Sequence, residues 1–357
     1  MWTYNKTNSR QLKSLCETVA PSTKEMGVQR IIAEYFKSLN IKCYGDAIGN
    51  LYARLNPEAN FNIAIVAHAD EVGLQVTDIT KQGLLKFRKL GGVRCTSMIG
   101  QKIEIMTAKG NVLGIVGSDP LQNNGTDSGL TLKTDDLWVD IGADNYEVAT
   151  TQVAIGDYGV FAPEFMQLNK HRVCSKSLDD RLGVFVMCQV MESLHKENLR
   201  IGVTAISSVL EEINMHGIMA CEKDFQAAIV LDVDFATDVP TDYPEMGMLE
   251  LGKGIGININ ADSNSIMQKI FVETMTKNQL PFQSTLGRNI SGGTDASKLH
   301  ACGNIATLNV NLPLRYMHSR YEMCDIRDIN CAVESVVKFI KQLEKNNTTD
   351  FVPWKNL

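Results

Sequence analysis

The chain has 357 residues, of which 44% are hydrophobic and 21% are charged, and its formal net charge is −6. A chain of this length and composition can build a full core and more than one domain. The acidic balance argues against a partner that is nucleic acid or an anionic membrane surface, so we expect a small-molecule or peptide partner.

The sequence carries no signal for export or membrane insertion. Residues 1–20 lack an apolar segment preceded by basic residues, and no apolar run reaches the roughly 20 residues that span a bilayer. The nine cysteines include no CxxC pair, which favours reduced thiols over a disulfide framework or a thiolate metal site. We therefore expect a cytoplasmic protein without a membrane partner.

The first 40 residues predict two helices, at 8–20 and 22–40, because apolar residues recur every three to four positions. Ser22 and Glu25 form a Ser-x-x-Glu pattern, which predicts a capping box at the start of the second helix. Further along, the apolar patterns predict strands at 50–55, 62–70, 201–209, 227–233 and 305–312, and helices at 180–197 and 265–279. Apolar strands that alternate with helices indicate an α/β sheet covered on both faces.

Residues 72–162 differ from the rest of the chain. They contain short, turn-punctuated runs rich in Val and Ile with little helical period. We interpret them as a β-rich domain inserted into an α/β domain formed by residues 1–71 and 163–357. The polar, Gly- and Asn-rich segment 119–136 predicts a mobile loop within the insert.

Metal-competent side chains stand where several predicted strands end and where the helix at 180–197 begins. Side chains beyond the carboxyl ends of strands in an open α/β sheet converge on one crevice. Two histidines and three carboxylates, one of them bridging, suffice for a dinuclear zinc site. The residues in these places are His68, Asp70, Asp179, Glu211, Glu212, Asp232 and His318.

Each residue also has a plainer interpretation. His68 could be a core histidine, and Asp179 and Asp180 could simply begin a helix. The adjacent Glu211 and Glu212 could lie on a solvated helix start. A metal site explains the pair better, because Glu212 can hold a cation while Glu211 takes a proton from the attacking water.

Six segments resemble, in order and context, the dinuclear metallo-aminopeptidases of the glutamyl aminopeptidase, tetrahedral aminopeptidase and so-called cellulase M type. They are AHADEVG, SLDDRLG, LEEINMHG, LDVDFATDVP, SGGTDASKLH and RYMHSRYEMCDIRDI. The resemblance implies that His68 and Asp232 hold one metal, that Glu212 and His318 hold the other, and that Asp179 bridges them. It also gives Asp70 the role of orienting His68 and Glu211 that of the general base.

The same resemblance implies a zinc-peptidase-like fold, with a mixed central sheet flanked by helices and a PDZ-like barrel at 72–162 used in dimer contacts. The implied activity is removal of the N-terminal residue of peptides by a metal-bridging water that Glu211 activates. Two divalent ions per subunit, zinc or cobalt, are implied as cofactors. Such proteins commonly form homo-oligomers, including dodecameric shells.

The substrate pocket is less well defined. The glycines of SGGTDA make Thr294 and Asp295 candidates for contacts with substrate, with a structural turn as the alternative. Arg320 could favour an acidic first residue, or could pair with Glu322 or Asp325 instead. Ala69, INMHG at 213–217 and Arg320 depart from the family pattern.

Two other functions compete with this one. A glycoside hydrolase would use paired carboxylates but would leave His68 and His318 without a role. A catalytically silent scaffold would keep the assembly and lose the chemistry, although the complete set of ligands argues against it.

Overall fold

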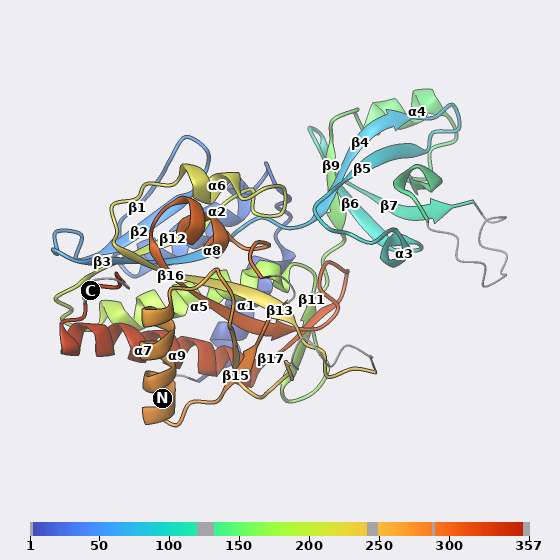
Figure 1. Cartoon of the computed structure of the whole chain (residues 1–357). Coiled ribbons are helices and arrows are strands. Elements are labelled where there is room, and N and C mark those ends of the chain that lie inside the picture. The colour runs from blue at the N-terminus through green and yellow to red at the C-terminus, as the bar shows by residue number, and fades with distance from the viewer. Residues whose placement is uncertain (1–2, 120–131, 241–248, 288–289, 353–357) are drawn as a thin grey trace.

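The computed structural model describes residues 3–119, 132–240, 249–287 and 290–352, and it contains an α/β body and a closed barrel (Figure 1). The body is built on an eight-stranded sheet in the order β1-β2-β12-β3-β13-β16-β14-β15. Its strands are β1 Cys43–Gly45, β2 Leu51–Leu55, β3 Asn62–His68, β12 Gly202–Ser208, β13 Ala227–Phe235, β14 Ile255–Asn258, β15 Phe282–Thr285 and β16 Ala306–Leu314.

The sheet is mixed, as predicted. Its four central strands, β12, β3, β13 and β16, are parallel, whereas β2 and β14 flank them in antiparallel pairings. The side chains of β3 are buried on both faces: Ile63 and Ile65 join one core cluster, and Ala64 and Val66 join another. A strand in such a position is expected to be almost wholly apolar, and residues 63–67 of β3 are entirely so.

Helices cover both faces of the sheet. The larger layer packs on the cluster that contains Ile63, and it consists of α1 Lys6–Glu17, α2 Met26–Ser38, α5 Leu178–His195, α7 Ser265–Lys277 and α9 Ile326–Asn346. The opposite face carries the short α6 His216–Ala220, α8 Asp295–Ser297 and the π-helical turn Lys298–Cys302. Helix α9 is one that the sequence patterns above did not single out.

A small second sheet adjoins the body. Its strands are β10 Met166–Gln167, β11 Arg172–Ser175 and β17 Glu322–Asp325, in that order. Strand β11 leads into the start of α5, and β17 follows the loop after β16. This sheet therefore joins two chain segments that carry predicted metal ligands, Asp179 and His318.

Residues 73–161 contain the closed six-stranded antiparallel barrel, with a core cluster of its own. Its strands are β4 Gly73–Ile79, β5 Leu85–Leu90, β6 Lys102–Thr107, β7 Gly110–Ser118, β8 Leu137–Asp140 and β9 Tyr158–Phe161. Short helices at Cys95–Met98 (α3), Thr134–Asp136 (η1) and Tyr146–Gln152 (α4) connect them. Most of the predicted mobile loop, residues 120–131, lies outside the described residues.

The predicted capping box is wrong. Helix α2 begins at Met26, and its N-cap residue Glu25 makes no side-chain capping bond. Ser22 Oγ instead donates to Asp70 Oδ2 over 2.6 Å, because the turn before α2 pairs with the chain just after β3 through a bridge between Pro21 and Glu71. The side chain of Ser22 therefore makes a tertiary contact with a residue 48 positions away in place of the local helix cap.

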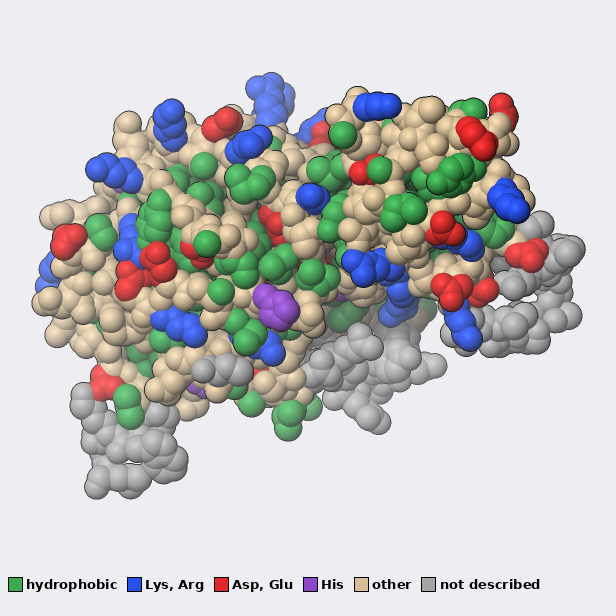
Figure 2. All heavy atoms as spheres, turned by 90° about the horizontal axis from the view of Figure 1, so that it is seen from above, with side chains coloured by type: hydrophobic (Ala, Val, Ile, Leu, Met, Phe, Trp, Pro, Cys, Tyr) green, Lys and Arg blue, Asp and Glu red, His purple; other side chains and the backbone are tan. Residues whose placement is uncertain are grey.

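Three further features concern membrane spans, cysteines and surface charge. Among the described helices, none is both long and apolar enough to cross a bilayer. Eight cysteines of the described residues are free, and most of them are buried. On the face seen in Figure 2, Lys and Arg side chains are spread among acidic ones.

Candidate metal centre

Four adjacent parallel strands deliver the candidate residues to one edge of the sheet. His68 ends β3, and Asp232 lies near the end of the neighbouring β13. Glu211 and Glu212 follow β12 on the other side of β3, and His318 follows β16 beside β13. The convergence expected from the carboxyl ends of parallel strands is present in the structure.

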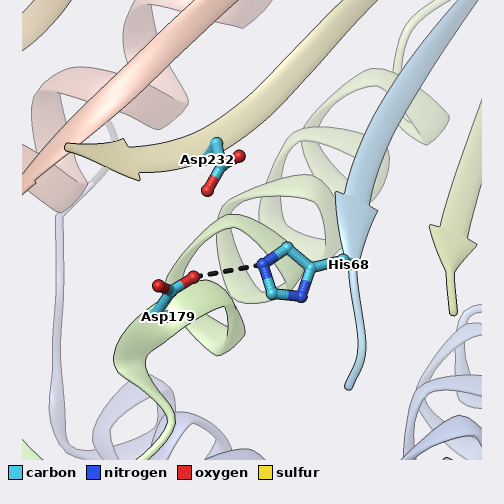
Figure 3. Close-up of side chains that lie close together, drawn as sticks. All are labelled: His68, Asp179 and Asp232. Atoms are coloured by element: carbon cyan, nitrogen blue, oxygen red, sulfur yellow. Dashed lines mark hydrogen bonds and ion pairs between the residues drawn. The ribbon is translucent and has the colours of Figure 1, made fainter. Parts of the chain in front are cut away.

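The first group of potential ligands comprises His68, Asp179 and Asp232 (Figure 3). One ligand atom from each lies within 4.8 Å of the others, and all three side chains are buried. His68 Nε2 is 3.1 Å from Asp179 Oδ1. The imidazole and the two carboxylates point toward one another from β3, the start of α5 and β13.

The second group comprises Asp179, Glu212 and His318, with ligand atoms that also lie within 4.8 Å of one another. His318 Nε2 is 3.1 Å from Asp179 Oδ2 and 3.3 Å from Glu212 Oε2. Asp179 therefore belongs to both groups, and each of its carboxylate oxygens faces a different histidine.

At the start of α5, the neighbouring Asp179 and Asp180 make different contacts, which the sequence alone did not distinguish. Asp179 and Asp180 have non-helical backbone angles, and Asp180 Oδ1 accepts a hydrogen bond from the Gly183 amide over 2.9 Å. A side chain that bonds the amide three residues on is a helix N-cap. Asp180 thus begins the helix, whereas the side chain of Asp179 turns toward the histidines.

Asp70 holds the two neighbouring glutamates in place. Its Oδ1 accepts the Glu211 amide over 3.0 Å, and its Oδ2 accepts the Glu212 amide over 3.1 Å. The carboxylate is fully buried and also lies 3.4 Å from His68 Nδ1. One side chain therefore bonds the backbone of both glutamates and lies beside the imidazole.

Several buried carboxyl groups lie close together in the site, and they shift the pKa values of one another and of the histidines. Burial, together with the carboxylates of Asp232 and Glu212, raises the pKa of Glu211 well above its usual value. Burial opposes ionisation of Asp179 too, but hydrogen bonds to His318 and His68 lower the pKa of Asp179. Burial lowers the pKa of His318, yet hydrogen bonds to Asp179 and Glu212 outweigh it and raise that pKa to about 12.

These residues fit divalent cations. Two imidazoles and three carboxylates are the donor types that zinc prefers. Glu212 Oε1 is buried and has no hydrogen-bond donor, although buried carboxylate oxygens are normally satisfied. Cations at the two groups would neutralise the crowded carboxylates and satisfy this oxygen.

A cavity of about 320 Å³ opens over the two groups, and Glu211, Thr294 and Arg94 are among the residues that line it. Asp295 lies behind the cavity wall, where its Oδ2 accepts a hydrogen bond from Ser208 Oγ over 2.6 Å. Thr294 Oγ1 accepts from the Ala296 amide, so the predicted structural turn is also present. The structure thus brings Thr294, but not Asp295, to the cavity surface.

Arg320 lies apart from the other candidates. It is not among the residues that line the cavity, and its Nη2 donates to Glu164 Oε2 over 3.1 Å. The predicted alternative partners are engaged elsewhere, since Glu322 accepts backbone amides and Asp325 pairs with Arg172. The pairing of Arg320 with an acidic side chain is present, but with a different acid.

Sequence reasoning missed several residues of the site. Ser22 and Glu322 contact site residues only through the fold, and the sequence patterns suggested other partners for both, a helix cap for Ser22 and Arg320 for Glu322. Gly92 follows β5 of the barrel, and a Cβ there would lie 2.8 Å from His318 Nδ1. The paired glycines at the end of KLGG offered a signal, because a glycine in a strand-end turn often allows close approach of another group.

The model of the M42 glutamyl aminopeptidase family matches residues 49–334. The chain belongs to this family. It is 32% identical over 350 residues to the lysyl aminopeptidase of Pyrococcus furiosus, an alignment that covers 96% of this chain and 98% of the relative.

Solved structures of M42-like proteins agree with the fold. A TET aminopeptidase from the archaeon Thaumarchaeota archaeon SCGC AB-539-E09 superposes with a TM-score of 0.91 at 28% identity, covering 97% of this chain and 99% of the other. The Pyrococcus horikoshii TET1 peptidase, which can assemble into a tetrahedron or a large octahedral shell, gives 0.82 at 29% identity, with 94% and 99% covered.

Membership of the M42 family decides between the functions considered above. The protein is an aminopeptidase, a hydrolase that acts on peptide bonds. The glycoside hydrolase alternative has no support from the family match, and it would also leave both histidines of the site unused.

Proposed function

We propose that this M42 aminopeptidase uses two divalent ions to remove the N-terminal residue of peptides. In this proposal His68 and Asp232 hold one ion, Glu212 and His318 hold the other, and Asp179 is shared. The observation that carries it is the position of Asp179, whose two oxygens each lie 3.1 Å from a different histidine. That is the arrangement expected of a bridging carboxylate.

The ions, zinc or cobalt, would supply Lewis-acid polarisation of the scissile carbonyl and a lowered pKa for the attacking water. The protein's own contribution is to fix the donors. His68 and Asp232 lie on adjacent strands, and Glu212 is held through its backbone by Asp70. A rigid donor set of this kind needs little reorganisation when substrate binds.

Glu211 is the proposed general base. It lines the cavity and belongs to neither ligand group, and its Oε2 lies 3.9 Å from His68 Nε2. Its carboxylate would take a proton from the attacking water and deliver it to the leaving amine. Burial and nearby carboxylates raise the pKa of Glu211, which makes its carboxylate a better proton acceptor than that of an exposed glutamate.

Asp70 is proposed to support both roles rather than to contact substrate. Its contact with His68 Nδ1 favours the tautomer whose Nε2 is free to bind a cation. Its two hydrogen bonds hold the backbone at Glu211 and Glu212, so that each side chain keeps its own direction toward the site. The split of roles between the adjacent glutamates therefore depends on Asp70.

We also propose a cytoplasmic homo-oligomer built from dimers, with residues 72–162 as the dimerisation domain and a dodecamer as the full assembly. Support comes from the likeness to the P. horikoshii TET1 peptidase, which assembles into shells. Thr294 at the cavity wall is a proposed contact for substrate, with Asp295 behind it.

A panel of aminoacyl-nitroanilides tests the proposed function. The protein is stripped of metal and then reconstituted with zinc, cobalt or manganese before each assay. We expect no turnover without metal and recovery with zinc or cobalt. Full activity of the stripped protein, or no activity with any metal on any substrate, would contradict the proposal.

A further inference from the structure

Glu322 links the backbones of two predicted ligands. Its Oε2 accepts the Asp179 amide over 3.0 Å, and its Oε1 accepts the His318 amide over 2.8 Å. Glu322 begins β17, pairs with Ser175 at the end of β11, and is only 1% exposed. A single buried carboxylate thus joins chain segments that are more than a hundred positions apart in the sequence.

Both segments leave regular structure where Glu322 contacts them. Asp179 has φ −82° and ψ 106° at the start of α5, and His318 has φ 60° in the loop between β16 and β17. Neither amide can rely on a helical or sheet partner at these angles. An amide shielded from water is costly to leave without an acceptor, so the carboxylate of Glu322 keeps both conformations favourable.

We propose that Glu322 is a positioning residue that sets the separation of Asp179 and His318 and thereby tunes the affinity of one ion. This inference rests on the proposed two-ion function. The two side chains it controls face each other at 3.1 Å between Asp179 Oδ2 and His318 Nε2. His68 and Asp232, by contrast, are placed by the central sheet and need no such link.

The chemistry requires a carboxylate at this position. A carboxylate accepts hydrogen bonds at both oxygens, whereas a glutamine of nearly the same shape has one acceptor oxygen and one NH₂ group. In Glu322→Gln the NH₂ group would face an amide N–H, and one ligand segment would lose its acceptor. The variant therefore tests the double contact with little change in volume.

The experiment is a two-step titration of the metal-stripped protein with Co²⁺, followed by visible absorbance. The step that is lost in His318→Ala identifies the ion held by that histidine. We expect Glu322→Gln to weaken that step by about 10–100-fold, the usual effect of removing a group that orients a ligand, and to change the other step less. The matched control is Glu164→Gln, since Glu164 holds side chains of the same loop, Arg320 and Tyr321.

The possible outcomes separate this inference from the proposed function. Unchanged steps in Glu322→Gln, or equal weakening of both steps, would overturn the positioning role. A wild-type protein that binds no Co²⁺ would overturn the two-ion proposal itself.

If Glu322→Gln does not fold, amide hydrogen exchange of the wild type provides the test. The amides of Asp179 and His318 should be strongly protected. Exchange as fast as that of exposed loop amides would overturn the inference.

Discussion

Replacing the adjacent glutamates one at a time separates a base from a ligand. Glu211→Gln removes a proton acceptor that belongs to neither ligand group, so both ions should remain bound. The rate should fall by about 10²–10⁴, the usual contribution of a general base, which corresponds to about 2.7–5.4 kcal/mol of transition-state stabilisation.

Glu212→Gln removes a ligand instead. Glu212 Oε2 lies 3.3 Å from His318 Nε2, and the Glu212 side chain is only 4% exposed. Solvent therefore cannot readily compensate for the lost negative charge. Metal affinity at this group should fall by more than the roughly 100-fold seen when a mere supporting residue is removed. Activity should fall with it.

The assay combines elemental analysis after dialysis with single-turnover rates on one aminoacyl-nitroanilide. The control is Glu222→Gln, which removes the same charge from an exposed side chain that pairs with Arg54. Equal loss of metal in the Glu211 and Glu212 variants would refute the division of roles. So would full metal content in both.

Three further predictions follow from other contacts. Asp70→Asn should lower metal affinity or activity by about 10–100-fold without abolishing the site, and metal titration that shows no change would remove its supporting role. Arg320→Ala should leave the ratio of kcat/KM for Glu- and Leu-nitroanilides unchanged, because Arg320 pairs with Glu164. A selective loss of tenfold or more on the Glu substrate would instead show that Arg320 contacts the first residue of the substrate. Burial raises the pKa of Asp238, but hydrogen bonds from Arg315 outweigh burial and lower this pKa below the ordinary carboxyl value. The stabilisation that these hydrogen bonds give the folded protein is therefore present above the ordinary carboxyl pKa and is lost as pH falls through the lowered value. Asp238→Asn should therefore lower the thermal midpoint at pH 7 by the equivalent of at most about 1 kcal/mol, and the difference from wild type should vanish in strong acid; a constant difference would contradict this account.

The sequence predicts those parts of the site that depend on regular structure. His68 and Asp232 lie at the ends of short apolar runs that predict buried strands, and the fold places such ends together. The β-rich character of the insert was likewise predictable, because its short strands lack any helical period, whereas its closure into a barrel was implied only by the family resemblance. Regular elements carry their own pattern, so the residues that follow them can be located.

Other parts of the site depend on contacts that leave no local pattern. Asp179 and Asp180 are chemically identical neighbours, and only the backbone turn before α5 decides which one caps the helix. Ser22 matched a capping box but bonds Asp70, whereas Arg320 bonds an acid that precedes β10. Each of these outcomes is set by tertiary packing, which overrides local preference.

In the proposed function Asp179 is shared by two ions. This sharing is tested by the metal content of Asp179→Ala after dialysis, measured beside His318→Ala. We expect Asp179→Ala to lose both ions, because the residue belongs to both ligand groups, whereas His318→Ala should keep the ion at His68 and Asp232. Retention of one tightly bound ion by Asp179→Ala would contradict the shared site.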